Sequence, residues 1–157
     1  MTGKEFEPYL AKMAIEVKKT ISKRLPDKMG NKAVSLFKKN FRDEGFFGKR
    51  WIKSKKRSGK TLTKTGDLGR SIDYEVRSSA GGGTAIVTSD LPYSRVHNEG
   101  GIIDVKPHKR TSDKGKRYNV RGYAYRAIKR QFMGDSPVLQ EELKKVIEKE
   151  MKSVISN

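Results

Sequence analysis

Apolar residues recur at steps of three and four along the first 44 residues, which is the period of a helix with one buried face. This spacing predicts a helix over residues 7–25, with Pro8 in its first turn, and a second helix over about residues 29–44. Pro26 and Asp27 are predicted to end the first helix and to begin a turn. We expect both apolar stripes to be buried: Phe6, Leu10, Met13, Val17 and Ile21 in the first helix, and Met29, Ala33, Phe37 and Phe41 in the second.

The periodicity disappears after the second predicted helix. Phe46, Phe47 and Trp51 are apolar anchors in a segment that is otherwise rich in lysine and arginine. Neither the helix period nor the strand period covers about residues 46–66, so we expect a basic, extended and partly mobile loop there.

Alternation of apolar and polar residues then predicts a β-hairpin. Residues 71–78 alternate with a period of two, and residues 84–89 follow after a glycine-rich connection, so the two segments are expected to pair. The second strand leaves two registers open. Either Ala85 and Val87 face inward, or Ile86 does.

A second, long basic hairpin is predicted over about residues 103–127. Its strands, about residues 102–105 and 118–125, flank a polar tip. Lysine and arginine bind phosphate without regard to base sequence, so we expect DNA-phosphate contacts from the cations of this hairpin. They are Lys106, Lys109, Arg110, Lys114, Lys116, Arg117 and Arg121. Tyr118, Tyr123 and Tyr125 lie among them, and their spacing is that of strand residues that pack into a sheet rather than stack on bases.

The chain closes with a third predicted helix. Ser136 is suited to cap it and Pro137 to occupy its first position. The face formed by Leu139, Leu143 and Ile147 is expected to pack on the sheet. The order of elements predicts a single α+β domain over residues 1–157, with an antiparallel sheet of about four strands packed by two N-terminal helices and one C-terminal helix.

Charge adds a partner class to this picture. The 157 residues include 36 Lys and Arg against 18 Asp and Glu, a formal net charge of +18, which favours a polyanion such as nucleic acid. The chain has no cysteine and two histidines without metal-ligand spacing, so we expect no metal and no cofactor. It shows no apolar run of membrane-spanning length and no signal peptide, so we expect a soluble, unexported protein without a membrane partner.

His97 is the main candidate for catalysis. With Glu99 and Asp104 nearby in sequence it allows a nuclease hypothesis, and in an extended segment His97 and Glu99 would point to the same side. No second acid–base residue stands at a meaningful spacing, however. A structural role for His97, as a neutral hydrogen-bonding residue beside a glycine turn, is the competing interpretation.

Several short motifs occur in a recognisable order. A strand start contains Gly66 and Leu68, and a "Tyr, x-x-x-His, x-x, Gly-Gly" stretch follows with Tyr93, His97, Gly100 and Gly101. An "Arg, x-Phe, x-Gly" segment then includes Phe132 and Gly134, directly before the predicted C-terminal helix. In this order, over roughly residues 29–147, the chain resembles the phage virion morphogenesis family, the Mu G-like tail completion and head–tail joining proteins.

The resemblance implies a function without catalytic residues. It implies a tail-completion or neck-protein fold, assembly with copies of itself into a ring around the DNA channel, and contact with tail tube or terminator and head connector proteins. The implied location is the head–tail junction of the virion, with the host cytoplasm during assembly. A sequence-independent nucleic-acid-binding protein is the alternative from charge alone, and a small nuclease is the third hypothesis.

Overall fold

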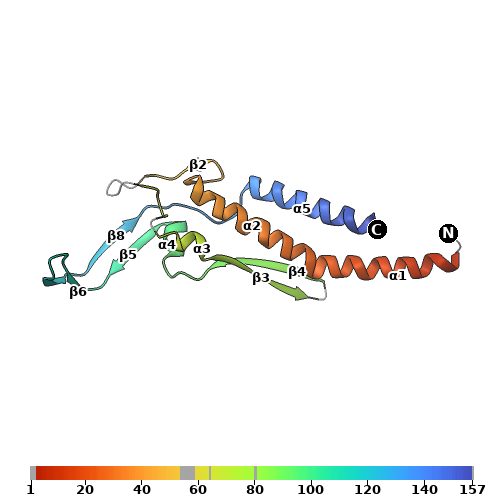
Figure 1. The fold of residues 1–157 in the computed structure, drawn as a ribbon, viewed down its shortest axis with the longest axis horizontal. Coiled ribbons are helices and arrows are strands. Elements are labelled where there is room, and N and C mark those ends of the chain that lie inside the picture. The colour runs from red at the N-terminus through yellow and green to blue at the C-terminus, as the bar shows by residue number, and fades with distance from the viewer. Residues whose placement is uncertain (1–2, 54–58, 64, 80, 157) are drawn as a thin grey trace.

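A long helical rod forms the spine of the molecule (Figure 1). The structure is a computed structural model that describes residues 3–53, 59–63, 65–79 and 81–156. The rod consists of helix α1 (Gly3–Lys19), a π-helical stretch η1 (Thr20–Arg24) and helix α2 (Leu25–Arg42), which follow one another without a turn. The predicted turn at Pro26 is therefore wrong.

The π-helical stretch explains how Pro26 is accommodated. Proline has no N–H, and its ring would collide with the carbonyl four residues earlier in a regular helix. In η1 the N–H of Leu25 donates to the Thr20 carbonyl, five residues back, which widens the turn just before the proline. The carbonyl of Ser22, which Pro26 cannot satisfy, accepts a hydrogen bond from Ser78 Oγ at 2.9 Å. A hydroxyl distant in the sequence thus replaces the missing donor.

A β-hairpin packs against this part of the rod. Strand β3 (Ile72–Ser79) pairs antiparallel with β4 (Gly82–Ser89), as the alternation predicts. Tyr74 and Val87 lie opposite each other and pack on the core, so the register with Ala85 and Val87 inward is the observed one. The approach is close, because a Cβ at Gly30 would overlap the Tyr74 ring. Any side chain at position 30 would push the hairpin off α2.

The C-terminal helix α5 (Pro137–Ile155) begins where the sequence predicts. Ser136 Oγ accepts the Leu139 N–H at 3.0 Å and satisfies a donor of the first turn. The helix lies along α2 rather than on a sheet (Figure 1), which corrects the expected packing. Leu139 is buried and Leu143 packs against the core, whereas Ile147 is exposed because the β-hairpin lies on another face of α2.

Ion pairs fasten α5 to the rod. Glu150 is buried and accepts from Arg24 at 2.9 Å and from Lys28 at 2.7 Å. One turn of α2 further along, Lys32 contacts Glu142 at 2.6 Å. Hydrogen bonds from Lys145 and Lys32 lower the pKa of the Glu142 carboxyl to about 2. The α2–α5 contact is therefore polar along one side and apolar along the other.

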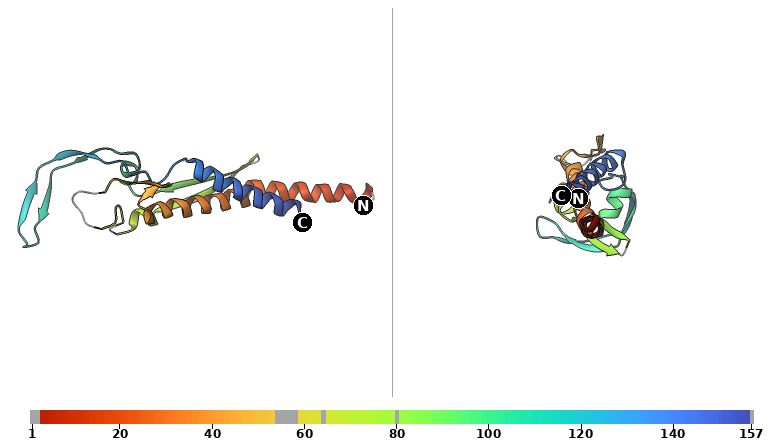
Figure 2. Two further views of the ribbon diagram at one scale, coloured as in Figure 1. Left: turned by 90° about the horizontal axis from the view of Figure 1, so that it is seen from above. Right: turned by 90° about the vertical axis from the view of Figure 1, so that its right-hand side faces the viewer.

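The apolar stripe of α1 is not buried as predicted. Phe6 is 50% exposed and Leu10 is 46% exposed, whereas Met13 and Val17, nearer the body, are half-buried. The reason is geometric, because α1 extends beyond the end of α5 and of the β-hairpin (Figures 1 and 2). The stripe of α2 is placed as expected, with Ala33, Phe37 and Phe41 buried.

The segment after α2 contains short elements instead of one loop. Strands β1 (Gly45–Phe46) and β2 (Lys49–Arg50) form a small ladder, and helix α3 (Asp67–Arg70) precedes β3. Trp51 is buried and its indole N–H donates to the Gln131 carbonyl at 2.6 Å. Lys55, Lys56, Arg57 and Lys64, part of the expected basic loop, lie outside the described residues.

The expected four-stranded sheet is not formed within the chain. After helix α4 (Ser94–Glu99), strand β5 (Gly101–Val105) pairs with β8 (Tyr123–Ala127), and β6 (His108–Thr111) pairs with β7 (Arg117–Val120). The described strands form four separate two-stranded ladders. The α+β class is confirmed. The second hairpin, however, projects from the body as an arm, residues 101–127, instead of joining β3 and β4 (Figures 1 and 2).

Candidate nucleic-acid interface

The arm is one long hairpin with a bend in its middle. Pro107 and Gly122 interrupt the two strands at the same level, between the β5–β8 ladder and the β6–β7 ladder. Pro107 has no N–H to donate to a ladder. A Cβ at Gly122 would lie 3.0 Å from Pro107 Cδ, so glycine leaves room for the proline ring across the strand pair. These two residues divide the arm into a base, next to the body, and a tip.

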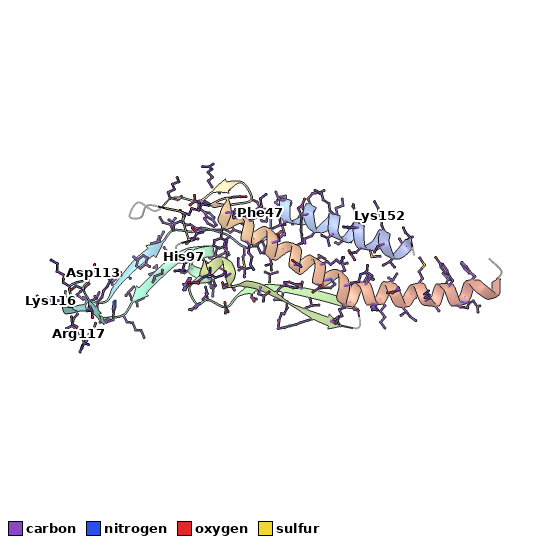
Figure 3. The ribbon with its side chains drawn as sticks, in the orientation of Figure 1. Phe47, His97, Asp113, Lys116, Arg117 and Lys152 are labelled. Carbon is purple, nitrogen blue, oxygen red and sulfur yellow. The ribbon has the colours of Figure 1, made fainter. Side chains whose placement is uncertain are left out.

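The turn at the tip is closed by Ser112. Its carbonyl accepts the Gly115 N–H at 2.9 Å, its own N–H donates to the Lys116 carbonyl at 2.9 Å, and its Oγ accepts the Lys116 N–H at 3.1 Å. Gly115 has φ +77°, a left-handed conformation that glycine adopts without strain. The tip is thus an ordered turn that presents Asp113, Lys114 and Lys116 to solvent (Figure 3).

All seven cations predicted to contact phosphate are exposed on the arm. Lys109, Arg110 and Arg117 belong to the tip ladder, and Lys116 immediately precedes β7. Lys114 lies in the turn, and Lys106 and Arg121 lie at the bend. The pairing Arg110↔Tyr118 and Thr111↔Arg117 puts cations on both faces of the ribbon, because neighbouring residues of a strand point to opposite sides.

Few acidic groups offset this charge. Asp104 and Asp113 are the acidic residues of the arm, against eight lysines and arginines, which gives residues 101–127 a formal charge of +6. Among the residues that the structure describes, no arm lysine or arginine forms an ion pair. The arm can therefore release counterions when it meets a polyanion without first breaking internal pairs.

The tyrosines of the arm differ from expectation. Tyr118, Tyr123 and Tyr125 are 44%, 52% and 47% exposed, and the rings of Tyr123 and Tyr125 stack at a centroid distance of 6.1 Å. They alternate along their strands as predicted, but a two-stranded ribbon that projects from the body has no second layer to bury them.

The arm is joined to the body through the segment 130–133. The backbone N–H groups of Phe132 and Met133 both donate to Asn98 Oδ1, each at 2.9 Å. Asn40 Nδ2 donates to the Phe132 carbonyl at 3.0 Å, and Asn40 Oδ1 accepts the Phe47 N–H at 3.1 Å. Two asparagines, one on α2 and one on α4, thereby fix the segment that leaves the arm.

Sequence reasoning missed both asparagines. Asn40 is a polar residue on the otherwise apolar, buried face of α2, which is a signal for an obligatory hydrogen bond. Asn98 lies inside the Tyr93–Gly101 motif, at a position that the motif leaves unspecified. Its two acceptor lone pairs suit two backbone donors that no strand partner satisfies.

The motif residues differ in burial and backbone conformation. Phe132 is completely buried and Leu68 is buried, whereas Tyr93 is partly exposed. Gly66, Gly100, Gly101 and Gly134 all have positive φ. At Gly100 a Cβ would also lie 3.2 Å from the Lys129 side chain. Phe132 and Leu68 thus occupy packing positions, and the four glycines occupy backbone conformations that favour glycine.

His97 lies on a helix, not in an extended segment. The spacing from Tyr93 to His97 is one helical turn, and the two rings meet edge to face at 5.9 Å. His97 and Glu99, two residues apart on a helix, do not share a face, and Glu99 pairs with Arg95 at 3.0 Å. The shared side for His97 and Glu99 that an extended segment would have given the nuclease hypothesis is therefore not formed.

The surroundings of the His97 imidazole favour its neutral form. Its Nδ1 is buried and has no hydrogen-bond partner among the described residues, so the expected side-chain hydrogen bond is not seen at that atom. The backbone carbonyl of His97 accepts the Arg130 N–H at 2.8 Å. Burial lowers the pKa of His97, and the Arg130 guanidinium lowers it further.

This lowered pKa predicts a pH dependence of folding. Above the ordinary imidazole pKa of about 6.5 the group is neutral in both states and has no effect. Below it the unfolded chain binds a proton that the folded chain resists, so stability falls as pH decreases. We expect denaturant titrations of His97→Gln to lose part of the decline in unfolding free energy between about pH 7 and pH 5. Identical slopes for the variant and the parent would contradict this assignment.

The described part of the chain meets neither the requirements of a metal site nor those of a membrane-spanning helix. No group of three or more His, Cys, Asp or Glu residues there could hold a metal ion. None of the described helices is long and apolar enough to cross a membrane. The described part of the chain is thus a helical body with an exposed basic arm, which is joined to it through Asn40, Asn98 and the buried Phe132.

Comparison with known proteins identifies the family. The chain belongs to the phage virion morphogenesis family, whose model matches residues 2–152. This confirms the resemblance that the motifs suggested and supports a structural role in a phage, in association with the virion. No curated protein and no solved structure matches the chain.

Proposed function

We propose that the protein is a tail completion or head–tail joining subunit that forms a ring around the DNA channel of the virion. The observation that carries the proposal is the arm, because seven exposed cations gather on a projecting hairpin that carries two acidic residues. Family membership supplies the setting, a phage particle in which DNA passes between head and tail.

The proposed ring follows from size and symmetry. One subunit of 17.8 kDa cannot surround a duplex, so a channel requires several copies related by a closed rotation. Each copy then presents two different surfaces to its neighbours. A net charge of +18 opposes association of free subunits at low salt, so we expect the ring to close on a tail or head template.

The proposed partners are the proteins on either side of the junction. A ring at the end of a tail would contact tail tube or terminator subunits on one side and head connector subunits on the other. The arm tips would point to the channel, where Lys109, Arg110, Lys116 and Arg117 would neutralise phosphates without reading sequence.

Electron microscopy of tails tests the proposal. Tails assembled with the protein should show a ring at the head-proximal end, and tails assembled without it should lack the ring and fail to join heads. Tails that lack this density but join heads normally would refute the assignment. Binding of DNA by the purified protein, without any association with tails, would favour the alternative of a free nucleic-acid-binding protein.

A further inference from the structure

The free edge of β4 is unusual in so charged a chain. Residues 78–89, which include all of β4, form a run of 12 residues without a charge, the longest in the sequence. Among the described residues, β4 forms backbone hydrogen bonds with β3 and with no other strand. Proteins normally protect such edges with lysine, proline or a bulge, and an unprotected edge is a template for pairing with another chain.

An apolar groove runs beside that edge. It has a volume of about 580 Å³ and lies between β4 and the start of α5, with α2 as its floor. Ala85 and Val87 line it from β4, Phe37 from α2, and Leu139 and Leu143 from α5. A strand added to β4 would place alternate side chains in this groove.

The base of the arm has the complementary surface. The pairs Ile103↔Tyr125 and Val105↔Tyr123 put four apolar or aromatic side chains on one face of the β5–β8 ladder. Both tyrosines of this face are about half exposed, and the ladder projects away from its own β4 (Figures 1 and 2). An isolated two-stranded ribbon with one apolar face is marginally stable in water, and packing another surface on that face stabilises it.

The charges of the two surfaces are also complementary. Residues 72–90, the receiving hairpin, contain Asp73, Glu75 and Asp90 against Arg77, a formal charge of −2 in a chain of +18. The arm carries +6. A contact between the arm of one copy and the hairpin of another therefore joins unlike charges, whereas pairing arm to arm would join like charges.

We propose that the β5–β8 ladder of a second copy of this chain adds to the free edge of β4. The product is a four-stranded sheet shared by two subunits, with Ile103, Val105, Tyr123 and Tyr125 of the second copy facing the groove. This inference rests on the proposed ring and describes the contact between its neighbouring subunits. Each subunit inserts the base of its arm beside β4 of one neighbour and receives the arm base of the other neighbour beside its own β4. The arm tip, beyond Pro107 and Gly122, stays free for DNA.

Engineered cysteines test this contact directly, because the chain contains no cysteine of its own. Thr84 and Thr88 are exposed and alternate along β4 with Ala85 and Val87, and Thr84 also borders the groove. Ile102 and Ala124 lie opposite the apolar face of the arm. In the shared sheet these four positions are on one face. Proteins with Thr84→Cys or Thr88→Cys are mixed, under mild oxidation and at salt high enough to screen repulsion, with proteins that carry Ile102→Cys or Ala124→Cys.

We expect disulfide-linked dimers that join a β4 cysteine to an arm cysteine, identified by peptide mapping. Lys152→Cys, on the exposed side of α5 (Figure 3), is the control for random collision and should link to the arm far less. Adding Thr88→Lys to the Thr84→Cys protein should lower the yield about tenfold or more, because it sets a like charge against the basic arm. In the monomer the same lysine faces Asp73 across the hairpin and keeps the fold. Dimers linked through two β4 cysteines would overturn the proposal.

The same experiment in tails separates this inference from the proposed function. A single chain with Thr88→Cys and Ala124→Cys should give a ladder of covalent multimers in purified tails. A ring on the tail without β4–arm links would overturn this contact and leave the function intact. Links in solution, with tails that carry no ring, would refute the function and leave the contact.

Discussion

Replacing Lys109, Arg110, Lys116 and Arg117 together with glutamate is expected to abolish binding to double-stranded DNA. All four are exposed at the arm tip, away from the core and from the base ladder, so the fold should survive. If each of the seven arm cations neutralises one phosphate, the parent should show a slope of log K against log salt of about −6. Fluorescence anisotropy over a salt series measures both the affinity and the slope.

The matched control reverses four exposed lysines of the rod, Lys12, Lys18, Lys23 and Lys38. Each reversal removes two charges, so both variants fall from +18 to +10. If DNA binds to the arm, the rod variant should keep most of the salt slope. Equal loss in both variants would mean that net charge alone drives binding, and base-specific protection in a footprint would contradict phosphate-only contact.

Phe132→Ala is expected to destabilise the protein by about 3–5 kcal/mol. The side chain is completely buried and its ring packs on Phe41 at a centroid distance of 5.0 Å. Removing the ring leaves a cavity at the point where α2, α4 and the segment leaving the arm meet. Urea denaturation followed by circular dichroism gives the change in unfolding free energy.

Phe6→Ala is the control for this loss, because it removes the same ring from a half-exposed position on α1. It should change stability by no more than about 0.5 kcal/mol. A similar loss at both positions would show that α1 is packed in solution. A small loss at Phe132 would show that the joint is not part of the cooperative core.

The local pattern of the sequence was sufficient for much of the fold. The buried stripe of α2, the Ser136 cap of α5 and the β3–β4 hairpin follow from spacing and capping rules that involve neighbours a few residues apart. The order of the motifs was also readable from local sequence and identified the family. The motif glycines mark particular backbone conformations, and Phe132 marks the core. The cations of the arm were also placed correctly on the surface, because charge is costly to bury.

Long-range contacts decided the rest. Pro26 does not end the helix because Ser78, 52 residues later, satisfies the carbonyl that proline leaves free. The N-terminal part of the α1 stripe is exposed because α5 and the hairpin stop short of it (Figure 2), which no periodicity can show. His97 lies on helix α4, whose Asn98 binds the backbone N–H groups of Phe132 and Met133, 34 and 35 residues later in the chain. The four strands do not unite because the arm leaves the body at Gly100 and Gly101. Local sequence determines which helix or strand a segment can form. Tertiary packing determines which surface of the protein that helix or strand contacts, because those contacts depend on residues far away in the chain.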